Sequence, residues 1–354
     1  MTELVVSRAA LKNNLGIIRE RAGGRALIGV LAHNAYGLGL VPTAKFLYEE
    51  GVRFFAVGDT AEAEKLRAGE FADIDILMLR PTCDPAEVER IIDLGVIATV
   101  GGQDSAMALS GLAERRGTVA EAHVRVDTGF GHYGFSHTEP DKILSVYRYM
   151  GSIAFTGLYT QYAPYGARKA LLAQSQSFGG VVEGLRAAKI ETGLIHAAGV
   201  GALLSEPKTE PYDALRVGVA LGGAPEWRRA GLVPAAKLRA SLTDTGHKPA
   251  GAVLGGKAIK KAARAGIVPM GTADGLGRTA QTRPPTFAKA LARLIRGESA
   301  PVLRLADGKK LKVLGRAGID AVAVNLGSSD IAVGADVYAD IDPLVCVCAS
   351  VRHI

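Results

Sequence analysis

Cysteine is scarce in this chain of 354 residues. Three cysteines, Cys83, Cys346 and Cys348, exclude a disulfide-rich scaffold and suit a reducing compartment. Long apolar runs are also missing, since the longest, at 74–79 and 96–100, fall far short of the roughly 20 residues that cross a bilayer. The N-terminus has no charged-then-apolar leader. We therefore expect a cytoplasmic protein without a transmembrane helix.

Aromatic residues make up only 6% of the chain, which bears on the meaning of its net charge of +7. The basic residues are dispersed, with the densest run at 257–264, and no aromatic residues interleave with them. A nucleic-acid surface needs such clustering, so we expect a mildly basic surface and no nucleic-acid partner. With 48% hydrophobic and 22% charged residues, the composition is that of a globular protein.

Short apolar runs alternate with helical patterns through the first two-thirds of the chain. Eight such units within about 210 residues, each with a nearly continuous apolar strand, predict a (β/α)8 TIM barrel. A doubly wound sheet is the alternative. In a barrel, chemistry lies at the C-terminal ends of the strands. The predicted strands cover residues 26–32, 54–57, 74–79, 96–100, 120–126, 153–159, 193–197 and 214–219.

After Gly223 the sequence changes to short alternating runs and glycine-rich turns, with one helical pattern at 282–295. We expect a barrel over residues 9–228 and a smaller, mainly β domain formed by residues 1–8 and 229–354. The N-terminal run at 3–6 is expected to join this β domain as a strand.

Short motifs in a fixed order run through almost the whole chain. They are NAYGLG at 34–39, HVRVDTG at 123–129, HAA at 196–198, DALRVGV at 213–219, LRA at 238–240, GTADG at 271–275 and GRAGID at 315–320. Together these motifs resemble the alanine racemase family. The resemblance implies an N-terminal barrel, a C-terminal β domain, pyridoxal phosphate chemistry of fold type III and a head-to-tail homodimer in which the partner completes each barrel mouth.

The resemblance also implies roles for residues that match the family's motifs. Tyr36 and the backbone amides of Gly218 and Val219 would meet the cofactor's phosphate. Arg216 would face the pyridine nitrogen, with His196 supporting it. These side chains form the scaffold of a ligand-binding pocket.

The chain departs from the family where the reaction takes place. The family's Schiff-base lysine corresponds to Ala32, whose methyl group cannot form an imine. The family's catalytic tyrosine corresponds to Gly255. Loss of a general base alone typically lowers a rate 10²–10⁴-fold. We expect neither Lys45 nor Lys257 to replace the lysine, so covalently bound pyridoxal phosphate is not expected, whereas weak non-covalent binding stays open.

Several pocket positions have changed as well. Val200 stands where the family has a phosphate-binding serine, and His132 where it has the arginine that grips the substrate carboxylate. Arg125 replaces an often carbamylated lysine. Gln161 and Thr272 replace a histidine and a tyrosine, while Asp127 is kept.

Two histidines, His33 and His132, are the remaining candidates for proton transfer at the barrel mouth. No HxH, HExxH or CxxC spacing occurs, so no metal site is expected. We favour a homologue that binds an amino-acid-like small molecule in a binding or regulatory role, a pseudoenzyme. The alternative is an enzyme with cofactor-independent proton-transfer or isomerase chemistry, and an active racemase is the least favoured reading.

Overall fold

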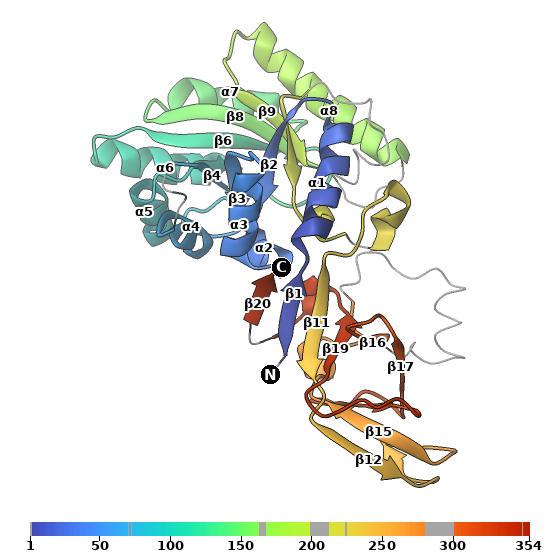
Figure 1. Ribbon diagram of the computed structural model, residues 1–354. Helices are drawn as coiled ribbons and strands as arrows, with labels where there is room; N and C mark the ends of the chain where they lie inside the picture. Colours follow the sequence, from blue (N-terminus) through green and yellow to red (C-terminus); the bar gives the residue numbers. More distant parts are fainter. Residues whose placement is uncertain are drawn as a thin grey trace. The chain divides into compact units, whose positions relative to one another are not determined.

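Eight parallel strands close into a ring in the part of the chain from Leu11 to Val233 (Figure 1). Their hydrogen-bonded order is β4-β3-β2-β10-β9-β8-β6-β5, and a parallel bridge between Leu77 and Ile97 joins the two ends. The prediction of a (β/α)8 barrel is confirmed. The strands of the ring are β2 (Ala26–Val30), β3 (Phe54–Val57), β4 (Asp75–Met78), β5 (Ala98–Val100), β6 (Ala120–Asp127), β8 (Ile153–Gln161), β9 (Leu194–Ala198) and β10 (Ala214–Val217).

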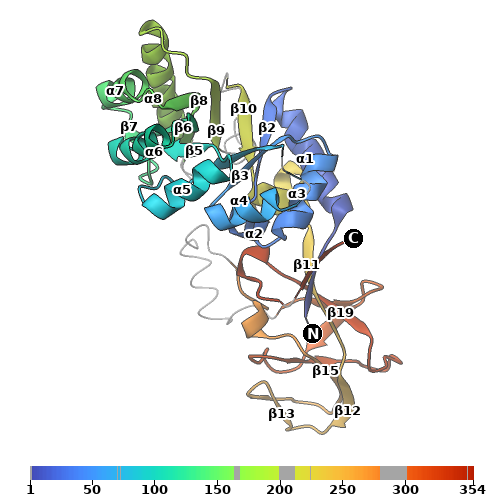
Figure 2. The ribbon, with the colours of Figure 1, turned by 90° about the vertical axis from the view of Figure 1, so that its left-hand side faces the viewer.

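The helices of this unit follow the strands along the chain, and α3 to α6 succeed one another outside the ring (Figure 2). Two of them begin as their sequences predict. Asp59 accepts a hydrogen bond from the Glu62 amide, and Asp84 does the same for Glu87, with Pro85 as the first helical residue. The elements outside the ring are α1 (Arg8–Ala22), α2 (Ala32–Tyr36), α3 (Leu40–Glu49), α4 (Thr60–Arg67), α5 (Pro85–Asp93), α6 (Gln103–Arg115), β7 (Phe135–Ser136), α7 (Pro140–Tyr149), α8 (Arg168–Ala187), η1 (Val219–Gly222) and η2 (Pro225–Ala230).

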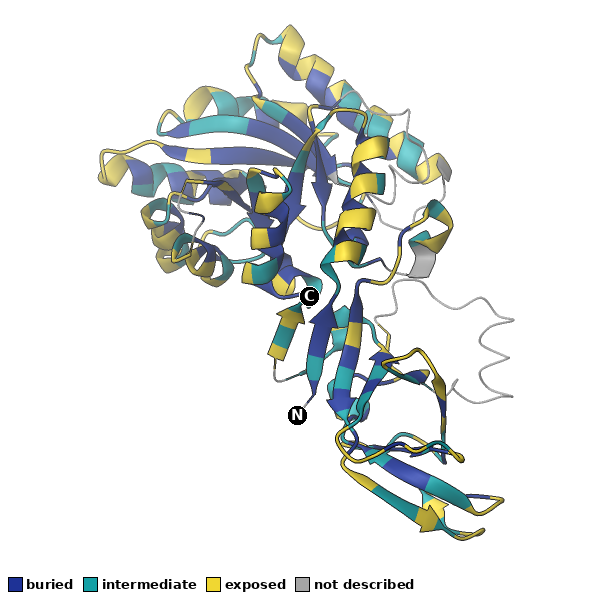
Figure 3. Ribbon diagram, viewed as in Figure 1, coloured by how far each residue is buried: buried dark blue, intermediate teal, exposed yellow. Residues whose placement is uncertain are grey.

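Burial follows this layering, since the barrel strands are mostly buried and the helices expose one face (Figure 3). Apolar side chains that include Ile28, Val30, Ala56 and Leu77 pack together with Tyr159 in one cluster of the barrel unit. Removal of this apolar surface from water is the main driving force for closing the ring.

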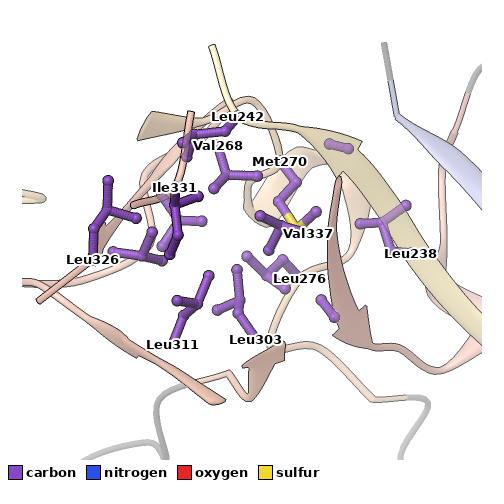
Figure 4. Close-up of a cluster of buried hydrophobic side chains, with 14 residues drawn as sticks. Leu238, Leu242, Val268, Met270, Leu276, Leu303, Leu311, Leu326, Ile331 and Val337 are labelled. Carbon is purple, nitrogen blue, oxygen red and sulfur yellow. The ribbon is translucent and has the colours of Figure 1, made fainter. Parts of the chain in front are cut away.

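The second unit, Met1–Ala10 with Pro234–Ile354, is mainly β. Its nine-stranded sheet has the order β12-β15-β18-β17-β16-β19-β11-β1-β20, in which β1 pairs antiparallel with β11 and parallel with β20. Fourteen buried residues form its core (Figure 4). Its elements are β1 (Glu3–Val6), β11 (Ala236–Ser241), β12 (Asp244–Lys248), β13 (Val253–Leu254), β14 (Lys257–Ala258), β15 (Ala263–Val268), η3 (Thr272–Asp274), β16 (Leu303–Leu305), β17 (Lys310–Val313), β18 (Val322–Asn325), β19 (Asp336–Asp340), η4 (Pro343–Val345) and β20 (Ser350–His353).

This computed structural model describes residues 2–69, 71, 73–162, 168–198, 212–223, 225–279, 301–348 and 350–354. The helix expected at 282–295 lies outside these residues. Within the described ranges, no helix combines the length and the apolar character that a bilayer span requires.

Candidate functional site

Polar and aromatic side chains gather at the C-terminal halves of neighbouring barrel strands. The strand register places Arg125 of β6 opposite Tyr159 of β8, and Tyr159 opposite His196 of β9. The Tyr159 and His196 rings stack with their centroids 4.9 Å apart and an interplanar angle of 13°. Strand pairing therefore assembles one cluster from residues that lie 34 to 71 positions apart in the chain.

Arg216 of β10 lies at the centre of this cluster and is only 3% exposed. Its Nη1 donates to His196 Nδ1 at 2.7 Å, and its Nη2 donates to the Thr160 carbonyl oxygen at 2.7 Å and to Gln161 Oε1 at 3.1 Å. Its guanidinium carbon lies 4.5 Å from the centroid of the Tyr159 ring. Three neutral acceptors and an aromatic ring thus hold this charged group in place.

Because a guanidinium can only donate, the contact with Arg216 fixes the tautomers of two histidines. His196 Nδ1 must accept, so its protonated Nε2 donates to His123 Nδ1, 2.9 Å away. Burial, together with the charge of Arg216, lowers the pKa of His123 to about 3 and holds the pKa of His196 well below its usual value. Both histidines are therefore neutral at physiological pH.

The segment after β2 forms a left-handed turn rather than the loop that its composition suggests. His33, Asn34, Ala35 and Tyr36 all have φ between +54° and +57°, a conformation that costs about 1–2 kcal/mol per residue. Glu62 offsets this cost, since its carboxylate accepts from the Asn34 amide at 2.8 Å and from the Gly58 amide at 2.9 Å. Such strain persists where the surroundings enforce it, which is common at ligand sites.

The turn brings the ring of Tyr36 against Gly218, where a Cβ atom would overlap it. Only glycine permits this approach, so Gly218 determines how deeply Tyr36 enters the barrel. Burial is the main cause that raises the pKa of the Tyr36 phenol, which keeps the hydroxyl protonated. Val219 follows Gly218 as the first residue of η1.

Asp127, at the end of β6, forms hydrogen bonds with the backbone of the loop that follows it. Its carboxylate accepts hydrogen bonds of 2.9 to 3.2 Å from the amides of Gly129, Phe130 and Gly131. Asp127 therefore shapes this loop. Gln161 also has a partner within the barrel, because its amide oxygen accepts a hydrogen bond from Arg216 of β10.

The two candidate proton-transfer residues are both exposed. His33 lies in the left-handed turn, and His132 packs edge-on against the Phe130 ring, with centroids 4.8 Å apart. Among the described residues, no group of three or more His, Cys, Asp or Glu side chains is arranged to hold a metal ion.

Ala32 follows β2 and is 6% exposed, with its Cβ directed towards Gly58. Val200 and Lys208 lie outside the described residues. All lysines of the barrel unit that the structure describes are exposed, namely Lys12, Lys45, Lys65, Lys142, Lys169 and Lys189.

In the second unit, Gly255 lies at a turn position that only glycine fits without strain. It occupies the turn between β13 and β14 with φ +53°, and a Cβ atom there would overlap the Arg316 carbonyl oxygen. The amides of Thr272 and Ala273 donate to the carbonyls of Gly318 and Ile319. The GTADG and GRAGID motifs are therefore hydrogen-bonded to each other.

Sequence reasoning assigned no role to His123, Tyr159 or Glu62. The first two could have been found from the period-2 alternation of barrel strands, because His123 precedes Arg125 by two residues and Tyr159 precedes Gln161 by two. The contact of Glu62 with Asn34 joins positions 28 apart, for which the sequence carries no local signal.

Comparison with known proteins gives consistent matches. The family model described as alanine racemase, N-terminal domain, matches residues 6–225. An alanine racemase of Carboxydothermus hydrogenoformans is 28% identical over 331 residues, which cover 90% of this chain and 84% of the relative. An alanine racemase of Beutenbergia cavernae is 32% identical over 291 residues, which cover 78% and 76%.

Solved structures share the whole architecture. An alanine racemase of Clostridium difficile superposes with a TM-score of 0.84 at 23% identity and covers 99% of this chain and 96% of its own. A histidine racemase of Leuconostoc mesenteroides gives a TM-score of 0.83 at 18% identity and covers 100% and 97%. At these identities the likeness establishes the fold, and the matches of sequence establish the relationship: the chain belongs to the alanine racemase family.

Proposed function

We propose that the protein binds a small amino-acid-like molecule at the C-terminal end of its barrel and does not racemise alanine through lysine-linked pyridoxal phosphate. The observation that carries this proposal is Ala32. The NAYGLG motif aligns this residue with the family's Schiff-base lysine, and every described lysine of the barrel unit is exposed. The described residues therefore do not fit a covalently attached cofactor, and no reaction step is assigned to one.

The rest of the pocket supports binding. Arg216 is held rigidly by three acceptors, and Tyr36 is held by an enforced turn. Pre-organised groups of this kind lower the entropic cost of ligand binding. The alternative, cofactor-independent proton transfer by His33 or His132, has less support, because both side chains are exposed.

The test uses the full-length protein with and without added pyridoxal phosphate. We expect no aldimine absorbance at about 420 nm in the protein after unbound cofactor is removed, no borohydride-reducible adduct and no conversion of L- to D-alanine, because a protein-linked aldimine requires a primary amine beside the cofactor's aldehyde and Ala32 supplies none. Titration calorimetry with D- and L-amino acids should detect binding to at least one of them.

A second assay tests the alternative function, cofactor-independent proton transfer. Proton NMR in deuterium oxide follows exchange of the α-hydrogen, with wild type, His33→Gln and His132→Gln compared. A yellow, borohydride-reducible protein that interconverts the alanine enantiomers would refute the proposal, and exchange that either variant abolishes would favour the alternative.

We also propose a cytoplasmic, head-to-tail homodimer. Val253 and Ile319 of the β unit are 68% and 75% exposed, so a partner subunit that covered them would bury apolar surface. The two-fold pair is the commonest assembly. Sedimentation velocity should give a dimer at micromolar concentration and a shift towards monomer for Ile319→Lys; a wild-type monomer would contradict this proposal.

A further inference from the structure

Arg125, on β6, is a buried cation with few hydrogen-bond partners among the described residues. It is 7% exposed, yet of its five N–H groups only one, on Nη1, has an acceptor among the described residues, the Leu79 carbonyl oxygen at 3.3 Å. Its Nε is buried without any hydrogen-bond partner. A buried polar group that lacks partners in a folded protein calls for a physical explanation.

Arg125 belongs to the cluster described above. Its guanidinium carbon lies 5.7 Å from the centroid of the Tyr159 ring and 5.5 Å from that of Tyr133. Arg216 faces the same Tyr159 ring. Burial lowers the pKa of Arg216 to about 10, and the positive charge of Arg125 acts in the same direction. Two like charges therefore lie close together in a dry environment.

No described carboxylate balances these two charges. Asp127 is bonded to the amides of its own loop, and Glu62 to the amides of Asn34 and Gly58. Among the described residues, neither arginine forms an ion pair. Leaving a charge buried and uncompensated costs several kcal/mol, so a ligand that supplies negative charge beside these arginines would relieve this cost.

The two arginines differ in how completely their donors are used. The acceptors around Arg216 already fix its position, whereas the Nη2 of Arg125 and most of its other donors have no described acceptor. A planar guanidinium with free donors beside an aromatic ring matches the planar geometry of a carboxylate, which it binds through two parallel hydrogen bonds.

We propose that Arg125 binds the carboxylate group of the ligand, with Arg216 supplying a second, fixed positive charge. This inference rests on the proposed function, since it names the part of an amino-acid-like ligand that enters the barrel. It assigns the anion to strand β6 and to neither His33 nor His132.

The test measures thermal unfolding at pH 7.5 and constant ionic strength with acetate or propionate as the probe and acetamide as the neutral isostere. Wild type should gain several degrees with the carboxylates and nothing with acetamide. Arg125→Met should lose this gain, with at least a tenfold weaker apparent affinity for acetate, and should be no less stable than wild type without the probe, because it removes an uncompensated charge. Arg125→Lys should retain part of the gain.

Arg148→Met is the matched control, because Arg148 is an exposed arginine of the same unit, and it should behave as wild type. Three results would overturn the assignment: no carboxylate-dependent stabilisation of wild type, an undiminished response in Arg125→Met, or stabilisation by inorganic phosphate alone. Failure of the proposed function is distinguishable, since amino acids would then fail to bind in calorimetry while acetate still acted through Arg125.

Discussion

Lowering the pH from 7 to 5 is expected to reduce the free energy of unfolding of the barrel unit by about 2 kcal/mol through His123, with a further loss through His196. Both histidines have folded-state pKa values far below the roughly 6.5 of an unfolded chain. The unfolded state therefore takes up protons first, and stability falls as the pH drops below about 6.5. The contribution of His123 over this interval is about 2 kcal/mol, and the lowered pKa of His196 acts in the same direction.

Urea unfolding monitored by tryptophan fluorescence provides the measurement, because Trp227 is the single tryptophan and belongs to the barrel unit. A variant with His33→Gln and His132→Gln serves as the control. Both of its replaced side chains are exposed, so it should keep the full pH dependence. A wild-type stability that stays level between pH 7 and pH 5 would show that the two histidines are not held neutral.

Replacing Gly157 by alanine is expected to destabilise the barrel by about 3 kcal/mol or more. Gly157 of β8 lies opposite His123 in the register, and an added Cβ would come 2.5 Å from His123 Cε1. The imidazole has little room to withdraw, because it packs edge-on against Phe54 and bonds to His196. Overpacking typically costs 1–3 kcal/mol, and a broken buried hydrogen bond adds about 1–3.

Gly179→Ala in α8 is the matched substitution, since an added methyl group there meets nothing within 4 Å. It should be neutral or stabilise the protein by up to about 1 kcal/mol through helix propensity. The same fluorescence-detected urea titration compares the two variants with wild type. If Gly157→Ala were as stable as Gly179→Ala, the histidine pair would be far more loosely packed than the structure indicates.

The sequence alone determined the elements that depend on neighbours within a few positions. The apolar runs located all eight barrel strands, and Asp59 and Asp84, whose residue type favours N-caps, begin two of the helices. The order of motifs identified the family, which the comparisons support. These signals are local because hydrogen bonds of caps and the spacing of apolar side chains span at most about one or two helical turns.

Only the tertiary structure decided what those elements place together. The two hydrogen bonds that link His123 to His196 and His196 to Arg216 join three strands, and no local sequence pattern encodes the register of those strands. The left-handed turn at Tyr36 depends on Glu62 from another element, and the fit of Gly255 depends on the Arg316 carbonyl. That Arg125 is buried without a counter-charge among the described residues is likewise a property of the closed barrel, because whether a charge is paired depends on all the strands around it and not on its neighbours in sequence.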